Sequence, residues 1–454
     1  MSFKYYIKTF GCAMNFSDSE RIASFLENYK FKLTQKIEKA DLVIFNTCGV
    51  RQMAEDRVYG QTHNLQKKIP TIKIVLTGCV AMRPDVQKRL ATKVDLFCQI
   101  SNFNKDILPL LEEIQNKKQN NNSIKNIIST KDKKTISNQE NIAYLATYPK
   151  YSNKFSANIP IMTGCNNFCA YCVVPYARGR EVSRSAEEIL TEIKKLIKNN
   201  YREIILLGQN VNSYQGTYQD KKINFSKLLK LVNSIPGNFW IRFVSSHPKD
   251  MTDDLITTIT KLKKVCECVH LPIQAGDNMI LKKMNRKYTR QHYLELIKKI
   301  KKSFQKNKPN KIFAITSDII VGFPSETKSQ FKKSAEVMLD VNYDMVYFGQ
   351  FSPRPGTTAW NMKDNISKKE KVRREKFLNE ILKKTCLENN RKYLDKTFTV
   401  LIKKKKNNFY YGETRTLKNV KLPIPKNTSH LIGNFAKIKI TKANIWNLEG
   451  EINL

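Results

Sequence analysis

Residues 161–184 read IMTGCNNFCAYCVVPYARGREVSR and directly follow a short apolar run that has the length of a β-strand. The segment contains Cys165, Cys169 and Cys172 in the spacing C-x3-C-x2-C. Soft thiolates at this spacing suit an iron–sulfur cluster, and three of them leave one iron of a four-iron cube without a protein ligand. A structural zinc site, the alternative, needs a fourth ligand, and the nearest histidine is the distant His247. We therefore predict a cluster with an open iron that can bind a substrate.

From residue 159 onward, the sequence alternates between strand-length apolar runs and helix-length amphipathic stretches. The runs are IPIMTG, EIILLGQ, FWIRFVS, CVHLPIQ, FAITSDIIVGFP and MVYFGQFS. Six β/α units over about 200 residues predict an open or partial (β/α)6 barrel of parallel strands, which we assign to residues 151–390.

Glycine and polar residues stand at the ends of these predicted barrel strands. Glycine lets a ligand approach the backbone closely, and amide or carboxylate side chains can hydrogen-bond a hydroxyl or an amine. Each residue alone is equally compatible with a simple turn. The candidates are Gly208, Gln209, Asn210, Gln274, Gly322 and Glu326.

The first 114 residues form a separate alternating series with KYYIKTF, DLVIFNT, KIVLTG and VDLFCQI as its apolar runs. This pattern predicts a doubly wound parallel sheet with helices on both faces. Cys12, Cys48 and Cys79 each follow one of these runs. Because the carboxyl ends of parallel strands lie on one edge of a sheet, we expect the three thiols to meet there. Any one of them alone is more often a small buried packing residue.

Two further segments complete the chain. Residues 115–150 are rich in Asn, Lys and Ser without periodicity, which predicts a linker. Residues 391–454 alternate at period two between turn signals, which predicts a small all-β module. Basic residues there alternate with Phe409, Tyr410 and Tyr411, a composition suited to RNA binding, although aromatic residues also fill the core of such modules.

Composition restricts the class of protein. The chain has 454 residues, with 80 Lys and Arg against 40 Asp and Glu, which gives a net charge of +40. This charge favours an RNA partner, with a Lys-rich solvated surface as the alternative. Ten cysteines without a secretory signal argue for metal or catalytic roles. No run approaches the roughly 18 apolar residues of a membrane helix, so we expect a cytoplasmic protein that does not enter a membrane.

The cysteine spacing at the mouth of a β/α barrel, followed by CVVPYARGREVSR, resembles the methylthiotransferase branch of the radical S-adenosylmethionine (SAM) enzymes. The segments FGCAMN, NTCGV and TGCVA are similar to further motifs of that family. The carboxyl-terminal module resembles the TRAM domain, with Gly412, Arg415 and Asn419 matching its usual pattern. The resemblance covers nearly the whole chain outside the linker.

The resemblance implies two [4Fe-4S] clusters and SAM as cofactors. Cys165, Cys169 and Cys172 would hold the cluster that binds and cleaves SAM, and Cys12, Cys48 and Cys79 an auxiliary cluster that delivers sulfur. The strand-end residues named above would surround SAM. Arg178, beside the first cluster, would bind a carboxylate or phosphate, although an ion pair with an acidic residue is equally compatible with its position.

TFGCAMN and PYARGREVSR favour one substrate within the family. They predict methylthiolation of C2 of N6-dimethylallyl (isopentenyl) adenosine next to the anticodon of tRNA. The alternatives are threonylcarbamoyladenosine in tRNA and an aspartate of a ribosomal protein. A different class is a non-catalytic zinc-containing RNA-binding protein. By family analogy, we also expect an electron donor such as flavodoxin or ferredoxin, a sulfur donor, and a monomeric chain.

Overall fold

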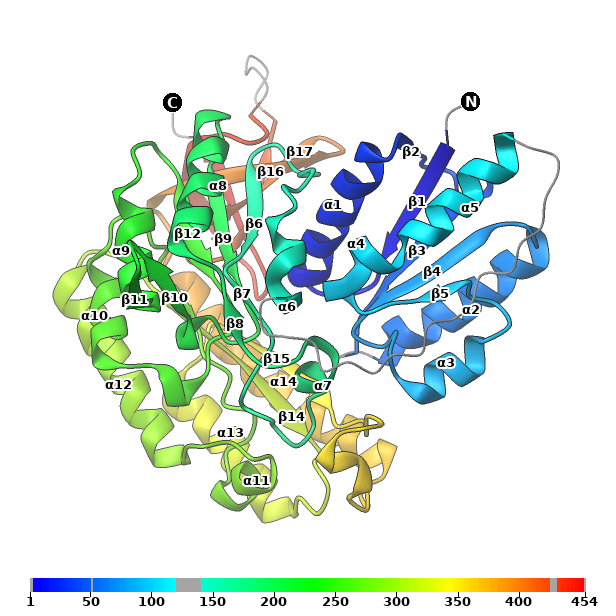
Figure 1. The fold of residues 1–454 in the computed structure, drawn as a ribbon. Coiled ribbons are helices and arrows are strands. Elements are labelled where there is room, and N and C mark those ends of the chain that lie inside the picture. Colours follow the sequence, from blue (N-terminus) through cyan, green and yellow to red (C-terminus); the bar gives the residue numbers. More distant parts are fainter. Residues whose placement is uncertain (1–2, 50–51, 120–139, 425–430, 453–454) are drawn as a thin grey trace. The chain divides into compact units, whose positions relative to one another are not determined.

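The computed structural model describes residues 3–49, 52–119, 140–424 and 431–452. The chain divides into two compact units, which Figure 1 shows as ribbons. The first unit comprises Met1–Ser152, Met162–Ser183 and Arg354–Trp360, and the second comprises Asn153–Ile161, Arg184–Pro353 and Asn361–Leu454. Cys165, Cys169 and Cys172 therefore belong to the same unit as the amino-terminal sheet.

A parallel sheet with the strand order β2-β1-β3-β4-β5 forms the centre of the first unit. Its strands are β1 (Phe3–Thr9), β2 (Phe31–Leu33), β3 (Leu42–Thr47), β4 (Lys73–Gly78) and β5 (Leu96–Phe97). The surrounding helices are α1 (Ala13–Asn28), α2 (Gln52–Lys68), α3 (Pro84–Leu90), α4 (Phe103–Asp106), α5 (Leu108–Gln119) and α6 (Glu140–Ala143).

Alternate residues of β3 enter two different cores. Leu42 and Ile44 pack with residues of α1 and α5, whereas Val43 and Phe45 pack with residues of α2 and α3. All residues of β3 are buried, as expected for a strand covered by helices on both faces. The predicted doubly wound parallel sheet is confirmed.

Helical structure enters both ends of the segment predicted as a linker. Helix α5 continues to Gln119, and α6 is followed by a 3₁₀ turn, η3 (Tyr144–Ala146). Tyr144 and Leu145 are buried in the core that α1 and α5 share. Two apolar residues in a polar stretch carry too little periodicity to reveal this. The central part of the linker, residues 120–139, lies outside the described residues.

Parallel strands in chain order form the larger part of the second unit. One sheet has the order β6-β9-β12 and a second has the order β13-β14-β15, and a parallel bridge between Ile241 and Val265 connects them. The strands are β6 (Ser156–Pro160), β9 (Glu203–Leu207), β12 (Trp240–Phe243), β13 (Cys268–His270), β14 (Ala314–Val321) and β15 (Met345–Gln350). Among the described residues β6 and β15 do not pair, so the predicted partial (β/α)6 barrel is confirmed.

Helices connect successive barrel strands, and most begin at a capping residue. Ser185 accepts a backbone hydrogen bond at the start of α8, and Ser367 does so at the start of α14. The Ser367 side chain accepts the Glu370 N–H, but the Glu370 carboxylate pairs with Arg373 and Arg374, so no reciprocal capping box forms. The helices are α8 (Ala186–Lys198), α9 (Phe225–Ser234), α10 (Asp253–Lys261), α11 (Asn278–Lys283), α12 (Arg290–Asn307), α13 (Lys328–Val341) and α14 (Lys368–Arg391).

The carboxyl-terminal strands close into a barrel with the order β16-β17-β18-β20-β19. They are β16 (Thr397–Lys406), β17 (Phe409–Thr414), β18 (Asn419–Pro423), β19 (Phe435–Ala443) and β20 (Leu448–Ile452). Ile438 and Ile440 of β19 face the barrel core, whereas Lys437 and Lys439 are exposed. Tyr410 is also a core residue, so it is not exposed for base stacking.

Buried ion pairs attach this small barrel to the amino-terminal ends of the larger barrel's strands. Arg242 pairs with Glu203 at 2.6 Å and donates hydrogen bonds to the carbonyl oxygens of Thr414 and Arg415. Arg415 in turn pairs with Glu267 at 2.6 Å. Arg242 and Arg415 therefore hold the small barrel against the larger one. The Arg415 side chain is already paired with Glu267.

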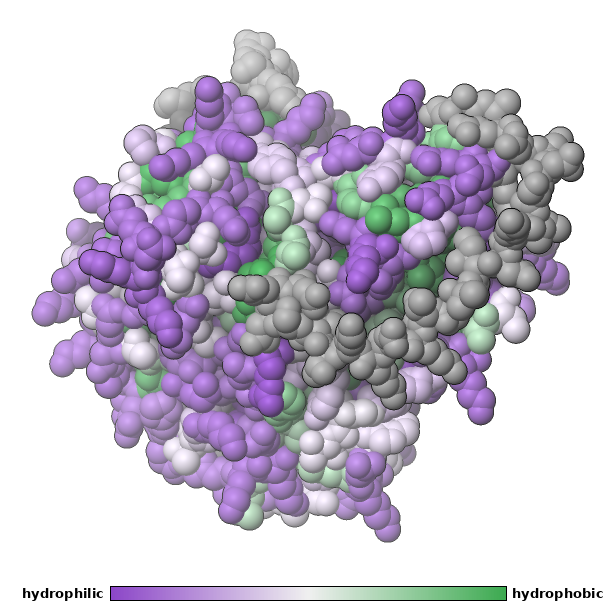
Figure 2. All heavy atoms as spheres, in the orientation of Figure 1, coloured by the Kyte–Doolittle hydropathy of each residue, from purple (hydrophilic) through white to green (hydrophobic). Residues whose placement is uncertain are grey.

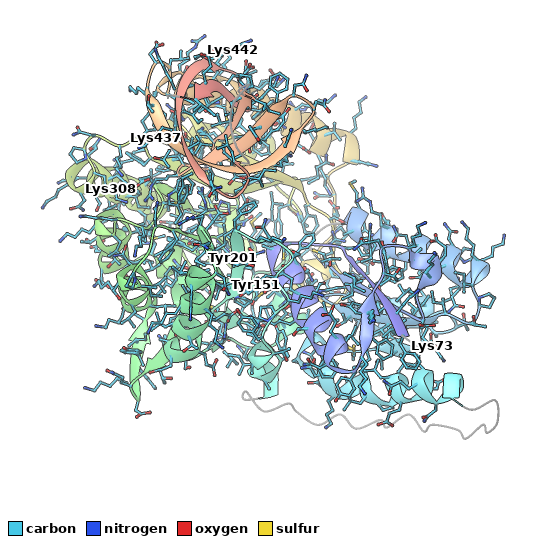
Figure 3. All side chains as sticks on the ribbon, turned by 90° about the horizontal axis from the view of Figure 1, so that it is seen from above. Lys73, Tyr151, Tyr201, Lys308, Lys437 and Lys442 are labelled. Atoms are coloured by element: carbon cyan, nitrogen blue, oxygen red, sulfur yellow. The ribbon has the colours of Figure 1, made fainter. Side chains whose placement is uncertain are left out.

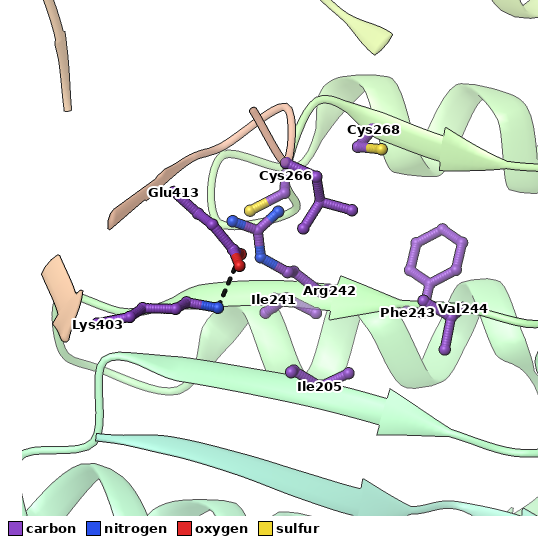
Figure 4. Close-up of a pocket in the computed structure, with 10 residues that line it drawn as sticks. Ile205, Ile241, Arg242, Phe243, Val244, Cys266, Cys268, Lys403 and Glu413 are labelled. Atoms are coloured by element: carbon purple, nitrogen blue, oxygen red, sulfur yellow. Dashed lines mark hydrogen bonds and ion pairs between the residues drawn. The ribbon is translucent and has the colours of Figure 1, made fainter. Parts of the chain in front are cut away.

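A small cavity lies beside these ion pairs (Figure 4). Its lining includes Arg242, Cys266, Cys268, Lys403 and Glu413. Burial raises the pKa of Cys268 to about 12 and also raises that of Cys266, so both remain protonated thiols. In β/α barrels, catalytic residues lie at the carboxyl-terminal ends of the strands. This cavity borders the small barrel through Lys403 and Glu413 and reaches Phe243 at the end of β12.

One face of the molecule is largely hydrophilic. In Figure 2, hydrophilic side chains cover most of the visible face and hydrophobic ones are confined to small areas. No helix within the described ranges is both long enough and apolar enough to cross a membrane.

Candidate iron–sulfur and cofactor site

Cys12 lies between the end of β1 and the start of α1. It is the N-cap residue of α1, and its backbone N–H and its thiol both lie 3.3 Å from the side-chain oxygen of Asn15. The Asn15 amide also donates to Asn46 and to the carbonyl oxygen of Thr47. Asn15 therefore links the Cys12 loop to the end of β3, where the next cysteine follows.

Cys48 and Cys79 follow adjacent parallel strands and are both buried. The backbone N–H of Cys79 donates to the carbonyl oxygen of Thr47 at 2.9 Å, so the two loops begin side by side. Gly78 has a φ of +89°, and a Cβ there would lie 2.4 Å from the Thr47 carbonyl oxygen. This close approach requires glycine. The strands that these three thiols follow, β1, β3 and β4, are neighbours in the sheet.

The Cys165 loop is held by its own backbone and by an adjacent turn. The backbone N–H of Cys165 donates to the Gly179 carbonyl oxygen at 3.1 Å, and the Asn167 amide lies 3.6 Å from the Cys165 sulfur. The loop lies between β7 (Met162–Thr163) and α7 (Val174–Arg178), and β7 pairs with β8 (Val182–Ser183). These contacts fix the loop independently of any bound cluster.

Contacts within the first unit connect the two sets of cysteines. A Cβ on Gly49 would lie 2.6 Å from the Val173 side chain and 3.3 Å from the Cys79 Cβ. Burial, with smaller contributions from Cys169, Cys165 and Cys79, raises the pKa of Cys172 to about 12. The residue after Cys48 thus lies against both Cys79 and the residue after Cys172.

Two buried guanidinium groups lie close to the auxiliary set. Arg178 pairs with Asp18 of α1 at 2.6 Å, and its charge interacts with Cys79. Arg354 lies 3.8 Å from Glu55, and its charge interacts with Cys48. Arg178 thus forms an ion pair with an acidic residue of the protein, which was the alternative to binding a carboxylate or phosphate of a ligand. No motif pointed to Arg354, which comes from a distant segment of the chain.

Three thiols in the spacing C-x3-C-x2-C suit the chemistry of an iron–sulfur cluster. Among the described residues, no group of three His, Cys, Asp or Glu side chains is close enough to enclose one metal ion. A four-iron cube holds its thiolates farther apart than one zinc ion does. Burial raises the pKa of Cys165 to about 11, so a metal must displace the thiol proton when it binds.

The second unit contains the other predicted cofactor residues. Gly208, Gln209 and Asn210 follow β9, and the side-chain oxygens of Gln209 and Asn210 are buried without a hydrogen-bond partner. The Asn210 amide nitrogen donates to Asp250 at 2.8 Å. The side-chain oxygens of Gln209 and Asn210 are therefore two hydrogen-bond acceptors at the end of β9.

Gln274, Gly322 and Glu326 belong to the ends of neighbouring strands. Gln274 has a φ of +73°, an uncommon value for glutamine, and it bridges to Ile319 of β14. The Gly322 N–H donates to the Glu326 carboxylate at 2.8 Å, and Arg374 pairs with the same carboxylate at 2.7 Å. Cofactor binding by Glu326 stays a prediction, and in the structure its carboxylate closes the loop after β14.

Sequence reasoning missed Ser246 and His247, which follow β12. Both are buried, and the Ser246 hydroxyl and the His247 Nε2 have no hydrogen-bond partner. The only available signal was a polar Ser-Ser-His run immediately after an apolar strand. That run is equally typical of a turn, so the sequence alone could not distinguish the two possibilities.

Family models match all three regions. The radical SAM superfamily matches residues 159–338, the Uncharacterized protein family UPF0004 matches residues 4–99, and the TRAM domain matches residues 391–452. The radical SAM methyltransferase TsrM from Kitasatospora setae has a similar fold, with 12% identity, a TM-score of 0.54 and coverage of 79% of this chain and 75% of that chain. The cobalamin-dependent SAM radical enzyme OxsB also has a fold similar to that of this chain. The identity is 10%, the TM-score is 0.52, and the match covers 84% of this chain and 55% of OxsB. The barrel and the Cys165 loop thus define a radical SAM protein.

Curated relatives are similar over nearly the full length. A tRNA-2-methylthio-N(6)-dimethylallyladenosine synthase from Thermoanaerobacter pseudethanolicus is 41% identical over 99% of this chain and 92% of the relative. One from Clostridium tetani is 41% identical over 98% and 96%. The chain belongs to the family of these relatives, the radical SAM methylthiotransferases.

Proposed function

We propose that this chain transfers a methylthio group to C2 of N6-dimethylallyladenosine beside the anticodon of tRNA. The relatives that carry the corresponding name match it at 41% identity over almost the whole chain. The observation that carries the proposal is that both sets of cysteines lie in one compact unit, with Gly49 in contact range of Cys79 and Val173. Sulfur transfer needs this proximity between a site that holds sulfur and a site that activates carbon.

The cysteines hold the cofactors in this proposal. Cys165, Cys169 and Cys172 bind one [4Fe-4S] cluster, and the auxiliary cysteines bind a second. When bound, these groups supply one-electron cleavage of SAM and the sulfur that is transferred. Cys48 and Cys79 are buried and Cys12 is exposed, so two of the three auxiliary ligands are shielded from solvent. Arg178 and Arg354 place positive charge near Cys79 and Cys48, respectively.

The strand ends of the larger barrel bind SAM in this proposal. Gly208 and Gly322 give close access to the backbone, while Gln209, Asn210 and Gln274 supply amide groups. Glu326 acts through Gly322, because its carboxylate holds the Gly322 N–H. Arg178 positions the cluster loop through its ion pair with Asp18.

Exposed lysines of the carboxyl-terminal barrel contact the phosphates of tRNA in this proposal. Lys437, Lys439 and Lys442 are exposed on β19, and Figure 3 labels the first and last of them. Such contacts position RNA without reading its sequence. The anticodon loop offers unstacked bases, so the target adenine can enter an active site without melting a duplex.

Several partners follow from the same proposal. The electrons come from a small donor such as flavodoxin or ferredoxin, and a separate sulfur donor restores the auxiliary site after each turnover. We propose that the chain works as a monomer in the cytoplasm, where modified tRNA is available.

Mass spectrometry of tRNA nucleosides tests the proposed function. Cells that lack the protein should contain N6-dimethylallyladenosine without the 2-methylthio group, and restoring the chain should restore the group. A change confined to threonylcarbamoyladenosine, or to an aspartate of a ribosomal protein, would assign the chain to another branch of the family. Stoichiometric zinc, no iron and no SAM cleavage in anaerobically purified protein would support a non-catalytic RNA-binding protein instead.

A further inference from the structure

Polar side chains of the neighbouring strands β13, β14 and β15 form a cluster around His270. The His270 Nδ1 lies 2.9 Å from the Thr316 hydroxyl, and the His270 Nε2 lies 3.5 Å from the Asp318 carboxylate. The ring of Tyr347 lies beside the His270 ring, with their centroids 6.3 Å apart. The strand register explains the cluster, because His270 is opposite Thr316 and Asp318 is opposite Tyr347.

The cluster faces the inside of the larger barrel. Cys268 lines the cavity of Figure 4 together with Ile205 of β9 and Arg242 of β12, so this side of β13 faces the barrel interior. Side chains alternate between the two faces of a strand, so His270, two residues after Cys268, points the same way. The partners of His270 on β14 and β15 therefore share the interior face.

This part of the interior is open to solvent. Tyr347 is 60% exposed, and the Asp318 side chain is 37% exposed. Interior positions of a β/α barrel normally hold packed side chains. Within the described part of the chain β15 pairs with β14 alone, so the interior lies next to an unpaired strand edge here. An exposed aromatic ring and an exposed carboxylate in mid-strand leave room for a ligand where a core would otherwise be.

The contacts of His270 determine what the cluster can offer to a ligand. The Thr316 hydroxyl can donate to Nδ1, so the neutral imidazole carries its proton on Nε2, and a protonated ring carries one there as well. The 3.5 Å between Nε2 and the Asp318 carboxylate is too long for a strong hydrogen bond. The Nε2–H is therefore a donor, and the carboxylate beside it is an acceptor.

A donor next to an acceptor selects one nucleobase. On the edge opposite C2, adenine presents the N6–H donor beside the N7 acceptor, whereas guanine presents two acceptors, O6 and N7. Cytosine presents a donor alone on the corresponding edge, and uracil an acceptor alone. An exposed aromatic ring next to such a pair gives the base a surface for stacking. The cluster therefore matches the N6–H and N7 edge of adenine.

We propose that His270, Asp318 and Tyr347 bind the target adenine, with the His270 Nε2–H donating to N7, the Asp318 carboxylate accepting from N6–H, and the base stacked on Tyr347. Dimethylallylation leaves one N6–H, so the substituted base keeps this edge when its chain lies on the N1 side. Binding by this edge leaves C2 facing away from the three side chains. The inference rests on the proposed function, because that function supplies the modified adenine and the reaction at C2.

Equilibrium binding of anticodon stem-loop RNAs to the anaerobically reconstituted full chain tests this assignment. One RNA carries N6-dimethylallyladenosine, and a second carries its 7-deaza analogue, which lacks the N7 acceptor. The wild type should bind the 7-deaza RNA about tenfold more weakly, as expected for one lost hydrogen bond. His270→Ala should bind the first RNA about tenfold more weakly and lose the discrimination, because N7 and the Nε2–H belong to one hydrogen bond. His270→Gln, which retains an N–H, should recover part of the affinity.

Asp318→Ala is a second variant that tests the other half of the base edge. Its side chain is more than one third exposed, so its removal should leave the fold intact. It should lose the discrimination against an RNA in which N6 carries both a methyl and a dimethylallyl group and therefore has no N6–H. His292→Gln, a change at an exposed histidine on α12, is the control and should bind every RNA as the wild type does.

Two results would overturn the assignment. One is a wild type that binds the normal and 7-deaza RNAs equally well. The other is that His270→Ala and Asp318→Ala both keep the wild-type ratios between the paired RNAs. The expected discrimination in a protein whose loss from cells leaves the 2-methylthio group of tRNA unchanged would overturn the proposed function and support the adenine-binding site.

Discussion

The Arg178 guanidinium lies 2.6 Å from the Asp18 carboxylate, and both side chains are buried. Asp18 belongs to α1, the helix that begins after Cys12, and Arg178 ends α7, the helix that follows Cys172. One ion pair thus connects the helix behind the auxiliary site with the helix behind the SAM-cleaving site.

Asp18→Asn should destabilise the protein strongly, because it leaves a buried guanidinium without its counter-charge. We expect a loss of about 3–5 kcal/mol in the free energy of unfolding. Urea unfolding under anaerobic conditions measures it, and iron content per chain should fall in parallel. Asp254→Asn is the matched control, because its pairing with Lys230 is more than half exposed and should contribute at most about 1 kcal/mol. Equal effects of both changes would contradict the linking role of Arg178.

Cys48→Ala should separate the two halves of the reaction. The Cys165 loop has its own backbone support, so SAM cleavage should persist while transfer of sulfur to tRNA is lost. Iron should fall from about eight toward about four per chain. Deoxyadenosine release, nucleoside mass spectrometry and iron analysis measure the three quantities. Cys98→Ala, at a buried thiol whose pKa burial raises to about 12, is the control and should keep both activities. Loss of both activities in folded Cys48→Ala would refute the division of labour.

Glu203 makes the attachment of the carboxyl-terminal barrel dependent on pH. Burial alone would raise its pKa, but the charges of Arg242 and Lys403 and a hydrogen bond from Ser156 lower it to about 2. Its stabilising contribution is therefore complete above the ordinary value of 4.5 and is lost as the pH falls toward 2.

Glu203→Gln should remove about 3 kcal/mol of stability at pH 7, and the difference from wild type should shrink to about half that by pH 3. Urea unfolding at both pH values measures this. Glu413→Gln is the control, since Glu413 pairs with the same Lys403 but is partly exposed and should have a small effect. A difference that does not change with pH would mean that Glu203 acts through packing and not through its charge.

Lys437→Gln and Lys442→Gln should weaken tRNA binding and reduce its dependence on salt. Each lost phosphate contact should lower the slope of log affinity against log salt by about 1. Binding assays at several salt concentrations measure the slope. Lys73→Gln is the control, because Lys73 is already paired with Asp95 in the amino-terminal sheet. An unchanged slope in the double variant would exclude β19 as the RNA-contacting strand.

The strand-level organisation of this chain was predictable from its sequence. An apolar run such as DLVIFNT is typical of a parallel strand that is buried on both faces. Because β3 and β4 are neighbours in the sheet, Cys48 and Cys79 follow adjacent strands. The partners of charged side chains were not predictable. Arg178 and Asp18 are 160 residues apart, and nothing local to either indicates the pairing. The placement of Ser246 and His247 likewise depends on the pairing of β9 with β12.

His247 should make the protein less stable in mild acid. Its pKa is about 2 in the folded state against 6.5 ordinarily, because burial and the charges of Arg286 and Lys249 disfavour the protonated ring, which also faces the edge of Tyr288. Folding is therefore favoured above pH 6.5 and weakened as the pH falls below it. Between pH 7.5 and 5.5 the wild type should lose about 1.4 kcal/mol more than His247→Gln, which has no titrating ring. Paired urea unfolding measurements at the two pH values give this difference, and an equal loss in both proteins would show that the ring is protonated or exposed in the folded state.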